Sequence, residues 1–123
     1  MVAANRLTDL LGVAAGTVDQ TVSAGDTMHN EIRGRYLMAG IVAVELIRRG
    51  MDAAGKERAD VIVDLPCGHG RVMRVLRAAF PEARLIACDI DREGVDFCAR
   101  TFAAEPVYSN SDPALVSLDV GPM

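Results

Sequence analysis

The chain has 123 residues, of which 50% are hydrophobic and 24% are charged, a balance that excludes disordered and fibrous proteins and fits one globular domain. Thirteen Lys and Arg against 17 Asp and Glu give a formal net charge of −4 without any basic run, which argues against nucleic acids and anionic membranes as partners. Aromatic residues make up 4% and Trp is absent, so a platform that stacks on bases or sugars is not expected.

The three cysteines indicate reduced thiols rather than a disulfide framework or a metal site. Cys67, Cys88 and Cys98 are odd in number and form no C-x-x-C pair, and no Cys/His spacing is typical of zinc, so no metal is expected. Reduced thiols are typical of the cytoplasm. No apolar run approaches the roughly 18–20 residues of a membrane-spanning helix. We therefore expect a cytoplasmic protein without a membrane partner.

Residues 1–25 are expected to form an N-terminal lead-in that is either helical or flexible. Gly12, Gly16 and Gly25 interrupt its apolar positions, so only a short amphipathic helix is compatible with the pattern. The interruption of the apolar stretch at Asp9 favours this interpretation over a signal peptide.

A longer helix is predicted from residue 28 to about residue 54. Asp26 or Thr27 is a suitable N-cap, and Gly55 is a suitable C-terminal stop. The inward-facing positions of this helix are expected to be Ile32, Tyr36, Ala39, Ala43 and Ile47. Tyr36 either covers a ligand or packs on the sheet.

The pattern then changes to that of a buried strand followed by a glycine turn. Residues 60–65 form a β-branched run without alternation, as expected for a strand buried on both faces. The residues that end this strand are Pro66, Gly68 and Gly70. A helix is predicted over residues 71–80, with Arg71, Arg74 and Arg77 on a solvated face.

A second strand and helix follow, and then a third strand. Residues 84–88 and 106–108 read as strands, and the helix between them begins after the N-cap Asp91 and ends near Phe102. This order is typical of a right-handed parallel β-α-β-α-β unit. We therefore predict an α/β fold with a Rossmann-like parallel sheet, preceded by N-terminal helices, and one domain over residues 26–123.

The glycine turn carries the main functional signal. Gly68 and Gly70 lack a Cβ and so let a ligand approach the backbone, and the helix that follows offers unpaired N–H groups. Asp89 ends the next strand, 21 residues after Gly68, where a carboxylate can accept hydrogen bonds from both hydroxyls of a ribose. Because open parallel sheets bind ligands at this edge, the sequence predicts a nucleoside-containing ligand there.

Two residues distinguish between nucleoside cofactors. A dinucleotide turn of the form G-x-G-x-x-G needs a third glycine, where this chain has Met73. Asp64, at the end of the first strand, repels a pyrophosphate but suits S-adenosylmethionine, which carries an ammonium and a sulfonium group. An NAD(P)-binding oxidoreductase fragment is the alternative, because both folds share the acid at Asp89. Asp64 can also be explained as a carboxylate that braces a loop or caps a helix.

Over these residues the chain resembles the class I S-adenosylmethionine-dependent methyltransferases. Their first motif, a hydrophobic strand followed by D-x-G-x-G-x-G, reads here as DLPCGHGR over residues 64–71, with Pro66 in place of the first glycine. The resemblance implies S-adenosyl-L-methionine as the cofactor, with Asp89 on its ribose, Ile90 against its adenine and Asp112 near the adenine amino group. The full set of cofactor-binding residues that it implies is Asp64, Pro66, Cys67, Gly68, His69, Gly70, Asp89, Ile90 and Asp112.

The resemblance also implies the reaction, an in-line transfer of the methyl group that depends mainly on proximity and orientation. Neither the acceptor nor a catalytic base is identifiable. The family's sheet has seven strands and this chain offers material for three, so we expect the N-terminal part of a longer methyltransferase or a product that self-associates. Residues 61–65, central in the family, would then be an exposed edge. A non-catalytic partner subunit is the remaining interpretation.

Three further side chains near the turn have ordinary structural explanations. His69 is expected to face solvent or to bond to the backbone rather than to act as a general base. Cys67 and Cys88 are expected to pack.

Overall fold

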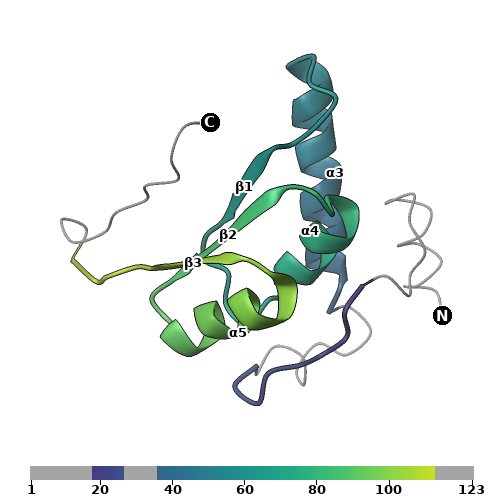
Figure 1. Cartoon of the computed structure of the whole chain (residues 1–123). Coiled ribbons are helices and arrows are strands. Elements are labelled where there is room, and N and C mark those ends of the chain that lie inside the picture. The colour runs from purple at the N-terminus through teal and green to yellow at the C-terminus, as the bar shows by residue number, and fades with distance from the viewer. Residues whose placement is uncertain (1–17, 27–35, 113–123) are drawn as a thin grey trace.

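The computed structural model describes residues 18–26 and 36–112 (Figure 1). Its helices and strands are α3 (Met38–Ala53), β1 (Val61–Asp64), α4 (Met73–Ala79), β2 (Arg84–Asp89), α5 (Arg92–Phe102) and β3 (Glu105–Tyr108). All three strands are parallel, in the order β1-β2-β3. The predicted α/β fold with a Rossmann-like parallel sheet is confirmed. The predictions for residues 1–17, 27–35 and 113–123 lie outside the described residues. Where it is described, the helix predicted from residue 28 begins later, because residues 36–37 form a turn and the N-cap of α3 is Leu37.

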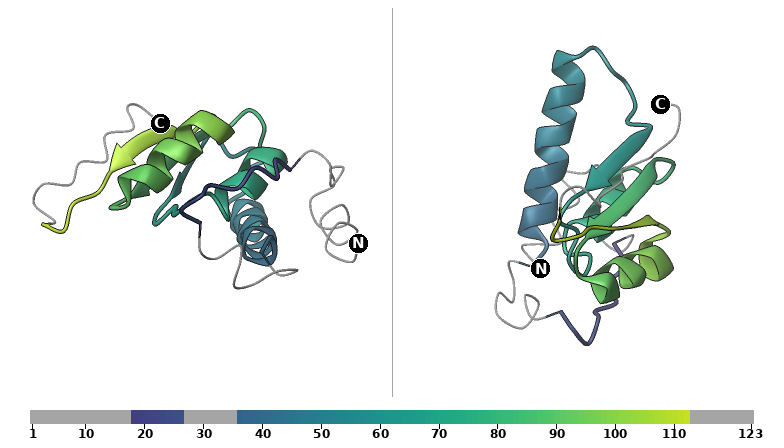
Figure 2. Two further views of the ribbon diagram at one scale, coloured as in Figure 1. Left: turned by 90° about the horizontal axis from the view of Figure 1, so that it is seen from below. Right: turned by 90° about the vertical axis from the view of Figure 1, so that its left-hand side faces the viewer.

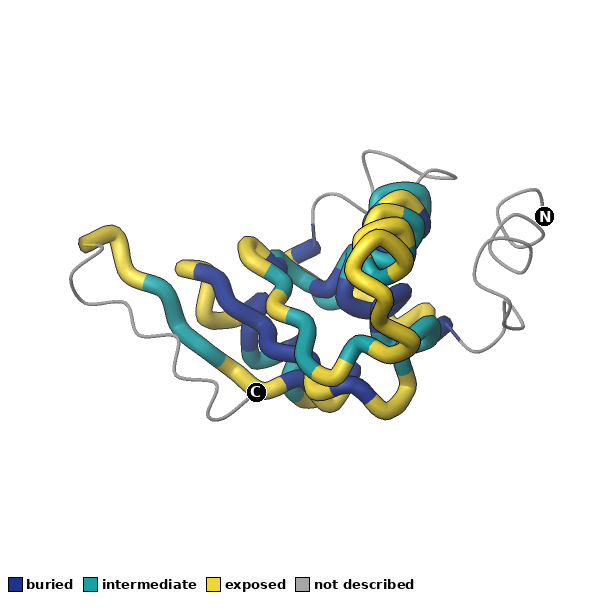
Figure 3. The backbone as a smooth tube through the Cα atoms, turned by 90° about the horizontal axis from the view of Figure 1, so that it is seen from above, coloured by how far each residue is buried: buried dark blue, intermediate teal, exposed yellow. Residues whose placement is uncertain are grey.

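The sheet is built around β2, which is buried along most of its length (Figure 3). Val63 of β1 pairs with Ile86 of β2, and Ile86 pairs with Glu105 of β3. The prediction that the first strand is buried on both faces is wrong, because Val63 is 42% exposed and Leu65 is 54% exposed. In the described sheet β1 is an edge strand with one neighbour, so its outward side chains lack the cover that the central β2 has.

The helices form a row against one face of the sheet. α4 and α5 both contact β2, and α4 also contacts α3 and α5 (Figure 2). Leu85 and Ala87 of β2 alternate onto this face and belong to the hydrophobic core, together with Val75 and Leu76 of α4. The core therefore lies between β2 and the helices that follow β1 and β2 in the chain.

The C-terminal end of α3 is set by Gly55, as predicted. Gly55 has φ +69°, and its N–H donates to the Asp52 carbonyl at 3.1 Å. The next N–H, that of Lys56, donates to the Met51 carbonyl at 2.8 Å. These two bonds form a Schellman motif, which requires a left-handed residue at the position of Gly55.

The predicted inward positions are correct at Tyr36, which is buried, and at Ile47, which packs against the core, but not at Ala39 and Ala43. Gly40, Ile41 and Val44 are buried, whereas Ala39 and Ala43 are only partly buried. A Cβ on Gly40 would lie 2.4 Å from Cγ2 of Val75 in α4. α3 therefore approaches α4 most closely at a glycine, and this contact determines which side of α3 faces inward.

The arginines of α4 do not form the predicted solvated face. Arg74 is only 1% exposed, and its guanidinium donates to the carbonyls of Gly70, Asp19 and Thr21 at 2.9, 2.9 and 2.8 Å. Its guanidinium carbon also lies 5.1 and 5.0 Å from the ring centroids of Tyr36 and Phe102. Peptide carbonyls and ring faces replace much of the water that would otherwise solvate this charge, although Nη2 is buried without a hydrogen bond within the described residues. Arg74 thereby holds residues 18–26, the N-terminal segment, against α4.

Candidate functional site

The glycine turn joins β1 to α4 at the carboxyl end of the sheet. The Leu65–Pro66 peptide bond is cis, and Gly68 and Gly70 have φ +53° and +85°. A Cβ on Gly70 would lie 2.3 Å from Cε2 of Phe102, so this glycine is required for packing. The space beside Gly68 is open, with nothing within 4 Å of the position of a Cβ. Gly68 is therefore where a ligand can approach the backbone.

Asp89 closes this turn with both of its carboxylate oxygens. Oδ2 accepts a hydrogen bond from the Gly68 N–H at 2.8 Å, and Oδ1 accepts one from the Asp91 N–H at 2.9 Å. The residue is 9% exposed and lines the adjoining cavity. Each oxygen has a second lone pair, so the same carboxylate can brace the turn and accept a hydrogen bond from a ligand.

Asp64 ends β1 beside Asp89 and lacks a complete set of partners. Within the described part of the chain, its buried Oδ2 has no hydrogen bond. Burial and the nearby Asp89 carboxylate raise the pKa of Asp64 to about 6. A positively charged group placed next to Asp64 would lower this pKa again, so the acid is suited to a cationic ligand.

A cavity of about 450 Å³ adjoins the turn. It is lined by Gly25, Asp26, Ala39, Pro66, Cys67, Gly68, His69, Arg71, Val72, Asp89 and Asp91. Its volume falls in the range of small-molecule sites. The structure thus brings together, at this cavity, five of the residues predicted from sequence: Pro66, Cys67, Gly68, His69 and Asp89.

The other four predicted residues do not line the cavity. Asp64 comes two residues before the lining residue Pro66 in the chain, and Gly70, which lies between the lining residues His69 and Arg71, packs against Phe102 instead. Ile90 is 61% exposed, and Asp112 is an exposed residue whose N–H donates to Asn110 Oδ1. The structure does not bring Ile90 or Asp112 together with the glycine turn in one cavity.

Several lining residues were missed by sequence reasoning. Gly25 and Asp26 come from the N-terminal segment, and Ala39 comes from the start of α3. Nothing in the periodicity of residues 18–26 shows that this segment returns to the turn. Arg71 is another lining residue that the sequence analysis places on a solvated helix face. Its position directly after the glycine turn is the one sequence signal that indicates a place at the cavity.

Both ring nitrogens of His69 form hydrogen bonds with side chains, contrary to the expectation that His69 faces solvent or bonds to the backbone. Nε2 lies 2.8 Å from Oδ2 of Asp91, and Nδ1 lies 3.0 Å from Oγ of Ser23. The side chain is 10% exposed. Hydrogen bonds from the Gly94 N–H and from His69 lower the pKa of Asp91, which therefore stays ionised at neutral pH. His69 thus joins the N-terminal segment to the N-cap of α5.

The charged lining of the cavity is mainly acidic. The lining residues include three acids, Asp26, Asp89 and Asp91, and one arginine, Arg71. The Arg71 Nε donates a hydrogen bond to the Tyr36 carbonyl. Asp26 accepts a hydrogen bond from the Tyr36 hydroxyl, and burial together with this bond raises the pKa of Tyr36. An excess of carboxylates favours a ligand with positive charge and disfavours phosphates.

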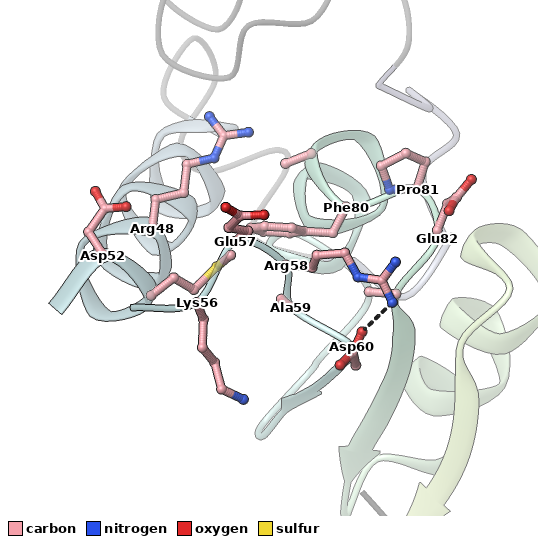
Figure 4. Close-up of a pocket in the computed structure, with 13 residues that line it drawn as sticks. Arg48, Asp52, Lys56, Glu57, Arg58, Ala59, Asp60, Phe80, Pro81 and Glu82 are labelled. Carbon is pink, nitrogen blue, oxygen red and sulfur yellow. Dashed lines mark hydrogen bonds and ion pairs between the residues drawn. The ribbon is translucent and has the colours of Figure 1, made fainter. Parts of the chain in front are cut away.

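A second cavity, of about 650 Å³, lies at the opposite end of the sheet (Figure 4). It is lined by the end of α3, by residues 56–60 and by residues 79–83. The Phe80 ring lies among side chains of both charges, and the Arg58–Asp60 ion pair of 3.1 Å is exposed. Parallel sheets bind their ligands at the carboxyl ends of the strands, so the glycine turn is the better candidate site.

No family model matches the chain, and comparisons with curated proteins and with solved structures found no match. Among residues 18–26 and 36–112, no group of three or more His, Cys, Asp and Glu side chains is placed to hold a metal ion. None of the helices in these ranges combines the length and the apolar character needed to cross a membrane.

Proposed function

We propose that this chain is the S-adenosylmethionine-binding part of a class I methyltransferase, and that it works in the cytoplasm. The observation that carries the proposal is an open glycine position, Gly68, in a cavity whose charged side chains are mostly carboxylates. A nucleoside with a cationic tail matches both features. The residue pattern of the turn and of Asp89 supports the same cofactor.

The residues present fit this cofactor in its charged and polar parts. Asp89, which lines the cavity, would accept hydrogen bonds from the ribose hydroxyls. Asp64 does not line the cavity, so its carboxylate would meet the ammonium group only where the cofactor extends past Pro66 and reaches the buried Oδ2, which has no partner in the described part of the chain. Gly68 would let the cofactor lie against the backbone. When bound, the cofactor supplies an electrophilic methyl group, and the chain's own contribution is to orient it and to compensate its positive charge.

An NAD(P) cofactor fits less well. The Gly68 N–H donates to Asp89 and the Gly70 N–H donates to the Cys67 carbonyl at 3.1 Å, so neither is free for a pyrophosphate. α4 is only seven residues long, and three carboxylates line the cavity. Each of these features weakens anion binding at the turn.

A non-catalytic partner subunit is the second candidate function. It is favoured by β1, whose outer edge is unpaired in the described sheet and which carries the exposed Val63. Such an edge is suited to pairing with another strand, either of a second copy or of a C-terminal half that completes the sheet.

Isothermal titration calorimetry with S-adenosylhomocysteine tests the proposal. We expect one-site binding that Asp64→Asn weakens about tenfold, because the variant keeps the shape of the side chain but loses its charge. NADH serves as the control ligand and Asp52→Asn, an exposed acid on α3, as the control variant. A folded protein that binds NADH but not the thioether would support the oxidoreductase alternative, and binding of neither would support the partner subunit.

A further inference from the structure

Ser23, His69 and Asp91 form a continuous chain of hydrogen bonds beside the cavity. The Ser23 Oγ lies 3.0 Å from His69 Nδ1, and His69 Nε2 lies 2.8 Å from Asp91 Oδ2. The three residues come from three places: the N-terminal segment, the glycine turn and the start of α5. His69 and Asp91 line the cavity that the methyltransferase proposal assigns to the cofactor, so an ester and a cofactor would occupy the same space.

The partners determine where the protons lie. A carboxylate only accepts hydrogen bonds, so the ring proton of neutral His69 is on Nε2, which faces Asp91. Nδ1 is then the acceptor for the Ser23 hydroxyl. The Gly25 N–H donates to the same Ser23 oxygen at 3.3 Å and stabilises negative charge on it.

Asp91 is held in place independently of the histidine. Its Oδ1 accepts a hydrogen bond from the Gly94 N–H at 3.2 Å as the N-cap of α5, which leaves Oδ2 for His69. A hydroxyl, an imidazole that accepts its proton and a fixed carboxylate that orients the imidazole are the parts of an activated nucleophile.

We propose that Ser23 is a nucleophile that takes up the acyl group of carboxylic esters, with His69 as its base and Asp91 as a positioning residue. His69, Asp91 and Gly25 line the cavity, and Ser23, two residues before Gly25 and partly exposed, is bonded to His69, so an ester would have to bind at the side of the cavity next to Ser23 to meet Oγ. The acidic lining selects esters whose remaining part is neutral or positively charged.

The reaction balances without a further reagent. Ser23 Oγ bonds to the ester carbonyl carbon while its proton passes to His69 Nδ1, and the bond to the alcohol oxygen then breaks. His69 gives the proton to that oxygen, which releases the alcohol. Water repeats the sequence on the acyl-serine, and the carboxylic acid leaves as Ser23 regains its proton.

Labelling of the full chain with diisopropyl fluorophosphate tests the proposal without any methyl donor. We expect one phosphoryl group per chain, located at Ser23 by peptide mass mapping, and no label there in Ser23→Ala. Slow hydrolysis of p-nitrophenyl acetate should be lost in the same variant. Thr101→Val, which removes a hydroxyl on α5 away from the cavity, should label at the wild-type rate.

Asp91→Asn separates activation from a merely structural contact. Asn keeps an oxygen for the Gly94 N–H, but its NH₂ group would face Nε2 and shift the ring proton to Nδ1. The labelling rate should fall at least about 100-fold while circular dichroism shows a folded protein. A folded wild type without label at Ser23, or equal labelling of Asp91→Asn, would overturn the proposal. The outcome does not depend on whether S-adenosylhomocysteine binds.

Discussion

The first turn of α5 lies directly against the glycine turn, because Gly94 faces the backbone of Gly68. A Cβ built on Gly94 would lie 2.3 Å from the Gly68 carbonyl oxygen, a distance that no side chain can accommodate without movement. The N-cap that holds Asp91 and the turn that shapes the cavity are therefore one packed unit.

Gly94→Ala should consequently disturb both stability and ligand binding. The added methyl group meets backbone rather than a flexible side chain, so we expect a loss of about 1–3 kcal/mol in the free energy of unfolding, measured with urea. Gly50→Ala is the matched control in α3, since nothing lies within 4 Å of the added Cβ. Gly50→Ala should be neutral or stabilising by up to about 1 kcal/mol. Equal effects of the two substitutions would contradict the packing argument.

Arg74 should be essential for attachment of the N-terminal segment. Arg74→Met keeps an apolar stem but removes the donors to the Asp19 and Thr21 carbonyls. We expect a loss of about 2–4 kcal/mol and faster amide hydrogen exchange within residues 18–26. Arg49→Met, which breaks the exposed ion pair with Glu45, should cost at most about 0.5 kcal/mol and leave that exchange unchanged.

The β-α-β-α-β order and the caps at Asp91 and Gly55 were predictable from sequence, because they depend on local patterns. The N-cap bond from Gly94 and the Schellman bonds after α3 are made within a few residues. Periodicity, turn residues and capping residues report such contacts directly.

The predictions from sequence that are wrong concern residues at which distant segments of the chain meet. Arg74 contacts carbonyls 53 and 55 residues away, and His69 contacts Ser23 across 46 residues. Viewed along α4 alone, Arg74 belongs to a polar stripe, and only the return of residues 18–26 buries it. The exposure of Val63 is likewise a property of strand order: the composition of the strand predicted burial on both faces, whereas the count of three strands predicted the exposed edge that the described sheet has.

Asp64 should make stability depend on pH in a defined direction. Its pKa rises from 3.8 to about 6 on folding, so the folded protein holds a proton that the unfolded chain releases. Stability is therefore lost as pH rises from about 4 to 6, by roughly 3 kcal/mol at most. Asp64→Asn should be more stable than wild type at pH 7, and this difference should shrink towards zero below pH 4.

Urea unfolding of both proteins at pH 4 and pH 7 measures this effect. Asp52→Asn removes the same charge from an exposed position and should show no comparable gain. If Asp64→Asn were less stable than wild type at pH 7, the carboxylate would have a stabilising partner and would not be available for a cation.

The unpaired edge of β1 should drive self-association of the isolated chain. Val63 is exposed on a four-residue parallel strand that pairs only with β2 in the described sheet, so backbone groups and apolar surface are presented together. Sedimentation velocity over a range of protein concentrations should show a species larger than the monomer.

Val63→Lys should shift the distribution towards the monomer, because a charge on an edge strand opposes pairing. Val42→Lys, at an exposed position of α3, adds the same charge away from the strand and should not have this effect. A wild type that stays monomeric at all concentrations would mean that this edge is protected in the isolated chain, and would count against both self-association and a partner that pairs there.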